Sequence, residues 1–104
     1  MTRMKYEWMW LASGIVDGAA YEKRGIYDSR TTKWHEELEV EQIDYILVLD
    51  EMKIPTAAKA AFYAHVINGC SLEAVAAHFH KAKSKMGDEL TTIMQHLRVS
   101  VQNS

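Results

Sequence analysis

Three lysines alternate along a short polar stretch in the last quarter of the chain, at positions 81, 83 and 85. Lysine ammonium groups bind DNA phosphates and donate to the major-groove acceptors of guanine, serine binds phosphate, and carboxylates accept from the amino group of cytosine. The stretch therefore predicts a DNA-binding surface. Its six candidate residues are Lys81, Lys83, Ser84, Lys85, Asp88 and Glu89. The two carboxylates oppose this prediction, because they repel phosphate.

The residues around these lysines have the spacing of a helix-turn-helix. We expect a helix over 71–79, a turn over residues 80–83, and a second helix over 84–100 whose first turn would enter the major groove. Ala76 is small enough for a close crossing of the two helices. Apolar side chains that would join them are Phe79, Met86 and Leu90. The same spacing also fits a plain helical hairpin in a small bundle, or a surface for a second copy or another protein.

Two features depart from the helix-turn-helix pattern. The turn contains no glycine, and Lys81 stands where an apolar residue is common. Gly87 lies inside the expected reading helix, where glycine costs about 1 kcal/mol relative to alanine.

Other kinds of chemistry have little support in the sequence. His78 and His80 are two residues apart, whereas paired metal ligands on a helix need i, i+4 spacing. Cys70 is the one cysteine, which excludes an intrachain disulfide and a CxxC metal site. The chain has no local Ser/His/Asp or Cys/His arrangement and no glycine-rich phosphate loop. We therefore expect no catalytic residue, no metal and no cofactor, and a protein that is not an enzyme.

Size and charge fit one small domain with two kinds of surface. The chain has 104 residues and a net charge of −2. Residues 35–51 carry seven acidic residues and no Lys or Arg, whereas residues 52–104 carry six basic and three acidic residues. This contrast permits one face for phosphate and another for a protein partner, although acids on a helix also form an ordinary solvated face. We find no secretory signal and no apolar run of about 20 residues, so we expect a cytoplasmic protein without membrane contact.

Apolar periodicity predicts an all-α fold of about five helices in a single domain, 1–104. Residues 1–34 would contain a helix over 3–13 with a stripe of Met4, Trp8 and Leu11, ended by Gly14, followed by a long basic and aromatic loop over 14–34. Residues 35–104 would form the helical core, with the helix-turn-helix at about 71–100.

Within that core, we expect helices over 36–51 and 57–67 before the helix-turn-helix. The stripe of the first contains Val40, Ile43, Ile46 and Leu47, and that of the second Ala58, Phe62, His65 and Val66. Asn68-Gly69 would close the second helix. Three residues are expected to be helix N-caps: Thr56, Ser71 and Ser84. The last helix has the longest stripe: Met86, Leu90, Ile93, Met94, Leu97 and Val101.

Short motifs along the chain resemble the small lambdoid-phage late-gene antitermination proteins of the Q family, the type without a zinc motif. The matching C-terminal residues are Ile43-Asp44, Leu47, Leu49, Phe62-Tyr63, Gly69-Cys70-Ser71, Val75-Ala76, Met86-Gly87 and Leu90. Fainter matches in the N-terminal half are Trp8, Trp10 and Gly18-Ala19-Ala20-Tyr21, with the two tryptophans closer together than in the family and Ala20 in place of a glycine. The C-terminal part is also similar to the promoter-reading helix-turn-helix of primary sigma factors.

The resemblance implies a phage or prophage transcription antitermination factor in the cytoplasm of a bacterial host. Such a protein binds double-stranded DNA beside a late promoter, engages paused RNA polymerase and makes it read through terminators. The resemblance also implies basic residues that face the RNA exit channel of polymerase, for which the candidates are Lys23, Arg24, Arg30 and Lys33. Two alternatives stay open: a stand-alone helix-turn-helix repressor or activator, and a small helical interaction module. The oligomeric state stays open too.

Overall fold

Helices make up the regular structure of the described part of the chain. The computed structural model describes residues 7–18, 29–40 and 45–102. In chain order the elements are α1 (Glu7–Gly18), α2 (Ser29–Val40), α3 (Tyr45–Glu51), α4 (Thr56–Phe62), the π-helix η1 (Tyr63–Ile67), α5 (Leu72–His78) and α6 (Lys83–Gln102). The predicted small all-α domain is confirmed, with six α-helices in the described residues instead of about five.

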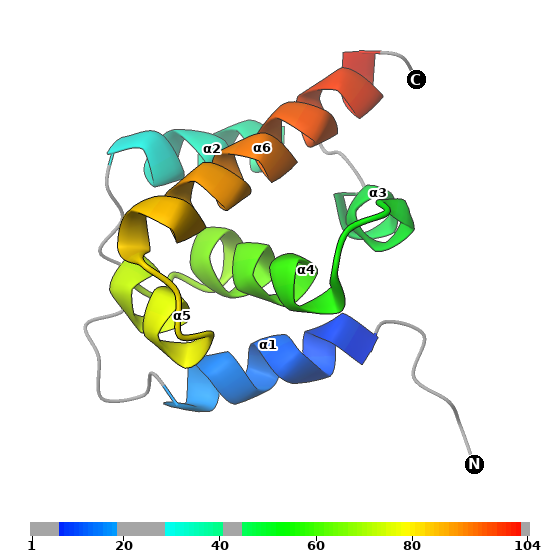
Figure 1. The fold of residues 1–104 in the computed structure, drawn as a ribbon. Helices are drawn as coiled ribbons and strands as arrows, with labels where there is room; N and C mark the ends of the chain where they lie inside the picture. The colour runs from blue at the N-terminus through cyan, green and yellow to red at the C-terminus, as the bar shows by residue number, and fades with distance from the viewer. Residues whose placement is uncertain (1–6, 19–28, 41–44, 103–104) are drawn as a thin grey trace.

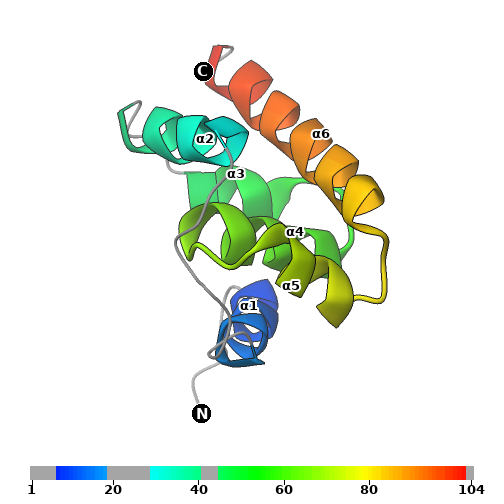
Figure 2. The same ribbon diagram turned by 90° about the vertical axis from the view of Figure 1, so that its left-hand side faces the viewer.

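The continuous rod formed by α4 and η1 lies at the centre of the molecule. In Figure 1, α1 runs below this rod and α2 and α6 lie above it, while α3 and α5 stand at its two ends. The perpendicular view in Figure 2 keeps the same three levels. The central rod contacts α1, α2, α5 and α6, so it is enclosed by the other helices.

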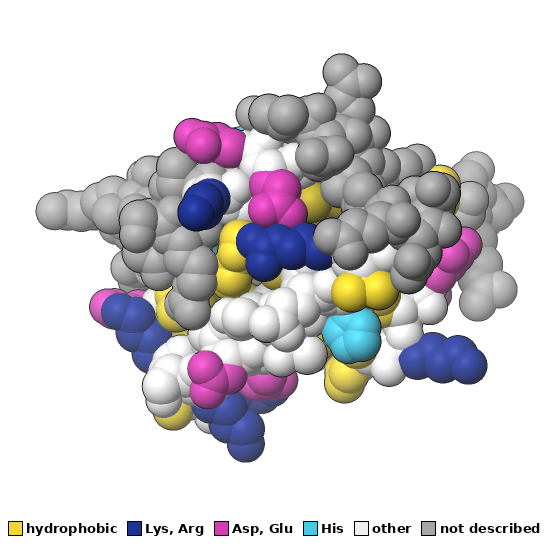
Figure 3. Space-filling view, turned by 90° about the horizontal axis from the view of Figure 1, so that it is seen from above, with side chains coloured by type: hydrophobic (Ala, Val, Ile, Leu, Met, Phe, Trp, Pro, Cys, Tyr) yellow, Lys and Arg dark blue, Asp and Glu magenta, His cyan; other side chains and the backbone are white. Residues whose placement is uncertain are grey.

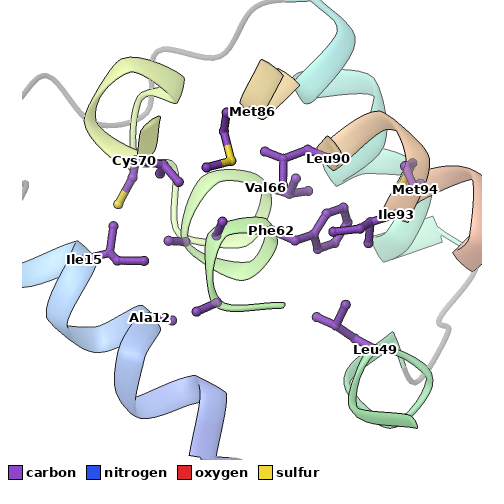
Figure 4. Close-up of a cluster of buried hydrophobic side chains, with 14 of the residues drawn as sticks. Ala12, Ile15, Leu49, Phe62, Val66, Cys70, Met86, Leu90, Ile93 and Met94 are labelled. Atoms are coloured by element: carbon purple, nitrogen blue, oxygen red, sulfur yellow. The ribbon is translucent and has the colours of Figure 1, made fainter. Parts of the chain in front are cut away.

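The composition of the central rod explains its position. Ala60, Ala61, Phe62, Ala64 and Val66 have no exposed surface, although they point to different sides of the rod. A helix that is apolar all round is buried, and alanine allows neighbouring helices to come close. Figure 4 shows the resulting core, in which Phe62 and Val66 lie toward the side chains of α6, and α1 lies on the other side of the rod. The other labelled core residues are Ala12, Ile15, Leu49, Cys70, Met86, Leu90, Ile93 and Met94.

The second half of the rod is a π-helix where the sequence predicted a continuous α-helix over 57–67. At its end, the Asn68 N–H donates to the Tyr63 carbonyl at 3.1 Å, five residues back. The predicted closure at Asn68-Gly69 is confirmed, because Gly69 takes φ 77° and the Cys70 N–H donates to the Ala64 carbonyl at 3.0 Å. The buried His65 is held by the same closure: its Nδ1 lies 2.7 Å from the Cys70 carbonyl, which can only accept, so Nδ1 donates.

The predicted N-terminal organisation is wrong in its helix boundaries. Gly14 does not end α1, which continues to Gly18, and α2 begins at Ser29, so residues 14–34 are not one long loop. Trp8 is buried as predicted, but Ala12 and Ile15 continue its stripe, while Leu11 is 43% exposed. The reason is energetic: burying Ile15 contributes about 1.5–3 kcal/mol, more than the roughly 1 kcal/mol that a helical glycine costs. Met4 and residues 19–28 lie outside the described residues.

The predicted helix over 36–51 is also wrong, because α2 and α3 are separate helices. The buried residues are Trp34 and Leu38 on α2 and Leu49 on α3, whereas Leu47 is 39% exposed and Ile46 is half-buried. The predicted stripe assumed one straight helix with a single buried face. The two helices instead present their apolar residues to different sides of the core. The other predicted stripe members, Val40 and Ile43, lie outside the described side chains.

Two of the three predicted helix caps are wrong. The N-cap of α4 is Pro55, with φ −58° and ψ 146°, and its carbonyl accepts from the Ala58 N–H at 3.0 Å. Thr56 is instead the first residue of α4, because proline already sets the extended geometry that an N-cap needs. The Ser71 cap is confirmed: its Oγ accepts from the Ala74 N–H at 3.0 Å. Ser84, the third predicted cap, lies inside α6.

Candidate nucleic-acid interface

The hairpin of α5, the following turn and α6 contains the lysine stretch. Its inward face follows the predicted spacing: Val75 and Ala76 on α5 and Met86 and Leu90 on α6 are buried, and Phe79 is half-buried. The two helices pack against each other and against the central rod. Farther along α6, the predicted stripe is confirmed for Ile93, Met94 and Leu97, whereas the side chain of Val101 lies outside the described part.

The turn between the two helices is tight although it has no glycine. His80 takes φ 55°, in the left-handed region that glycine usually occupies after a helix. The His80 N–H donates to the Ala77 carbonyl at 3.1 Å, and the Lys81 N–H donates to the Ala76 carbonyl at 2.9 Å. These are the two hydrogen bonds of a Schellman motif, which ends α5 sharply. Histidine is among the non-glycine residues that tolerate this conformation best.

The helix α6 begins one residue earlier than predicted. Lys83 is its first residue, and the Ala82 carbonyl accepts from the Met86 N–H at 3.0 Å, so the chain is helical before Ser84. Ser84 cannot be the N-cap, because it already has helical geometry. It is an exposed residue of the first turn of α6. Its hydroxyl is thereby on the surface that carries the lysines.

Two of the three lysines form ion pairs within the hairpin. Lys81 Nζ lies 2.8 Å from Glu89 Oε1 and 2.9 Å from Oε2, so it donates to both oxygens of that carboxylate. Lys83 Nζ lies 3.0 Å from Glu73 Oε1 and links the start of α6 to the first turn of α5. The charges of Lys81 and Lys83 are therefore locally neutralised by acids of the same hairpin.

Lys85 differs from the other two lysines. It is exposed on the first turn of α6 and forms no ion pair with any residue of the described part. Asp88, one turn later, is also exposed, and its main-chain carbonyl accepts from the Thr92 hydroxyl at 3.1 Å. Of the six residues predicted to bind DNA, all lie at this end of the hairpin, and Lys85 is the cation left available for phosphate.

Sequence reasoning missed three further polar residues of this surface. Thr92, Gln95 and His96 are exposed on α6 and follow Asp88 at i+4, i+7 and i+8, so they continue its outer face. Glutamine and threonine both make contacts with base edges in DNA complexes. The signal was present in the sequence, since these positions are the gaps in the apolar stripe of α6.

Of the four basic residues proposed for the RNA exit channel, Lys33 is the one whose side chain belongs to the described part. Lys33 is exposed on α2, and α2 is joined to the second half of α6 by a pair in which Arg98 donates to Glu37 at 2.9 and 3.1 Å. Arg30 lies on α2, but its side chain is outside the description, as are Lys23 and Arg24.

Charge on the α2–α6 face is mixed. Figure 3 views the molecule from this side, and its described Lys and Arg side chains lie apart, with acidic or uncharged side chains between them.

No group of three or more His, Cys, Asp or Glu in the described residues is arranged to hold a metal ion. Within the same residues, no helix has the length and apolarity needed to cross a bilayer.

Comparison of the chain with protein-family models, curated proteins and solved structures found no match.

Proposed function

We propose that this protein binds double-stranded DNA through the hairpin of α5 and α6, with the first turn of α6 in the major groove. The observation that carries the proposal is the arrangement of that turn. It exposes Lys83 at the helix start, and it exposes Ser84, Lys85 and Asp88 on the side away from Met86 and Leu90, which anchor the helix in the core. A rigidly held helix end with polar side chains outward is the arrangement that helix-turn-helix proteins place in the groove.

The hairpin is also rigid at its turn, which favours recognition over loose attachment. The Ser71 cap and the two hydrogen bonds after α5 fix where α5 begins and ends, so α6 starts in a defined direction. In this placement Lys85 contacts a phosphate, and Asp88 with the neighbouring polar residues of α6 faces base edges.

The finer proposal is that DNA binding serves transcription antitermination by bacterial RNA polymerase in a phage or prophage. It rests on the resemblance of short motifs, several of which have structural roles: Gly69 closes η1, Ser71 caps α5, and Val75-Ala76 belong to the helix that packs against α6. In vitro transcription across a terminator tests it. Readthrough that requires both the protein and a promoter-proximal DNA site would support antitermination; specific DNA binding without readthrough would favour a repressor or activator.

A small helical interaction module is the second candidate, and two observations favour it. Lys81 and Lys83 are neutralised by ion pairs, which lowers the attraction of the hairpin for phosphate. Trp10, on the outer side of α1, is 66% exposed, and exposed tryptophan is over-represented at protein-binding hot spots. Under this proposal the lysine surface has no DNA affinity.

Titration of a labelled random-sequence DNA duplex at several salt concentrations separates the two candidates. Lys85→Ala removes one phosphate contact, so we expect weaker binding and a salt slope, d log K/d log[salt], smaller in magnitude by about 0.9. Lys53→Ala is the matched control, because Lys53 is an exposed lysine in the connection between α3 and α4. Equal binding by the wild type and both variants would contradict the placement of α6; no binding by the wild type would contradict the function.

A further inference from the structure

The two ion pairs of the hairpin are placed on the surface that would face DNA. Glu89 binds Lys81 with both carboxylate oxygens, and Glu73 binds Lys83 across the gap between α5 and α6. We infer that Glu73 and Glu89 are internal competitors of DNA phosphate, which keep two of the three lysines occupied until a DNA backbone displaces them. This inference rests on the proposed DNA-binding function and concerns the regulation of the same surface.

Exposure makes such displacement feasible. The side chains of Lys83 and Glu73 are 59% and 74% exposed, and those of Lys81 and Glu89 are 37% and 35% exposed. Exposed ion pairs shift an equilibrium constant by only about 1.4- to 5-fold. A phosphate can therefore take over either lysine, but each takeover reduces the affinity by about that factor.

The two pairs are not equivalent. The Lys81–Glu89 pair is bidentate and less exposed, so Glu89 is the stronger competitor, whereas the Lys83–Glu73 pair has a single contact at 3.0 Å. We expect Lys83 to be released first as DNA approaches. Lys85, which has no internal partner among the described residues, would make the initial contact.

Competition by the glutamates should change the number of cations released when DNA binds. A lysine that neutralises a phosphate releases about 0.9 of a condensed cation from duplex DNA. A lysine that stays paired with its glutamate neutralises no phosphate, so it releases no cation and adds nothing to the slope. The wild-type salt slope should therefore be smaller than three lysine–phosphate contacts would give, and removal of each competitor should restore most of the missing contribution.

A double-mutant cycle on one pair tests this directly. Using the full chain and the same random-sequence duplex, we expect Glu73→Gln to tighten binding by about 1.4- to 5-fold and to increase the magnitude of the salt slope by up to about 0.9. In a Lys83→Ala background, Glu73→Gln should have neither effect, because the lysine that it releases is missing. Glu89→Gln should act in the same way through Lys81, with the larger change.

Glu51→Gln is the matched control for net charge, since Glu51 is an exposed acid at the end of α3, and α3 and α5 lie at opposite ends of the central rod. Circular dichroism would check that each variant is folded. If the wild type binds DNA and Glu73→Gln or Glu89→Gln changes nothing, the competition is overturned while DNA binding stands. The competition is also overturned if Glu73→Gln tightens binding equally in the presence and in the absence of Lys83. It is likewise overturned if Glu51→Gln tightens binding as much as Glu73→Gln. Absence of DNA binding in the wild type and in every variant would overturn the proposed function itself.

Discussion

The two faces of the α5–α6 hairpin are held by different forces. The inward face is continuous and apolar: Val75, Ala76, Met86 and Leu90 are buried against each other and against the central rod. The outward face is polar and discontinuous, with two ion pairs, a lysine that has no ion-pair partner in the described residues and an exposed aspartate. One face therefore determines that the hairpin forms, and the other determines what it can bind.

This difference has a thermodynamic basis. Burial of one leucine side chain contributes about 1.5–3 kcal/mol, whereas an exposed ion pair contributes about 0.2–1 kcal/mol. The outward residues can therefore change without loss of the fold, and their arrangement can be adapted to a ligand. Three experiments test this division, beginning with the one that has the largest expected effect.

Leu90→Ala should remove stability from the inward face. Leu90 is 1% exposed, so the substitution loses burial and leaves a cavity, at a cost of about 2–5 kcal/mol. Urea unfolding followed by circular dichroism measures this loss. Gln95→Ala, at an exposed position of the same helix, should stay within about 0.5 kcal/mol. Similar losses in both variants would remove the distinction between the faces.

Ser71→Ala should have an intermediate effect, because it acts at the boundary between the faces. It deletes the oxygen that accepts from the Ala74 N–H and should cost about 1 kcal/mol of unfolding free energy. Ser71→Asp retains a capping oxygen and should recover most of the loss, with thermal unfolding as the measurement. No difference between alanine and aspartate would mean that the cap does not hold the start of α5.

The Lys81–Glu89 pair should give the smallest effect on folding. A double-mutant cycle with Lys81→Ala and Glu89→Gln should yield a coupling of about 0.2–1 kcal/mol in unfolding free energy. That value is well below the Leu90 loss, even though the pair has two short contacts. A coupling above about 2 kcal/mol would show that the outward face also holds the hairpin together.

The same contrast separates what could be predicted from sequence and what could not. The stripe of α6 and the Ser71 cap were predictable because they depend on residues within one or two helical turns of each other. The extent of α1 and α2 was not, since Ile15 and Trp34 are stabilised by packing against other helices, which outweighs the local loop signals of Gly14 and its neighbours. Local propensity gave the right class of structure but the wrong boundaries there.

At the candidate site, residue types could be predicted but their pairing could not. Lys81 and Glu89 are eight residues apart, and Lys83 and Glu73 are ten residues apart on different helices. Their contacts depend on the turn at His80. The sequence did not indicate its left-handed conformation, because the turn contains no glycine. Charge alone therefore suggests three unpaired lysines, whereas in the hairpin Lys81 and Lys83 form ion pairs and Lys85 forms none with the described residues.

The π-helix η1 affects how this chain can be aligned with others. Its hydrogen bonds join residues five apart, so Tyr63–Ile67 contains one residue more than an α-helical path over the same distance would need. A chain with the same fold but an uninterrupted α-helix here would match this sequence only with a one-residue gap between positions 63 and 67. Without that gap, every position of the hairpin, including Ser71 and Lys85, would be compared with the wrong neighbour.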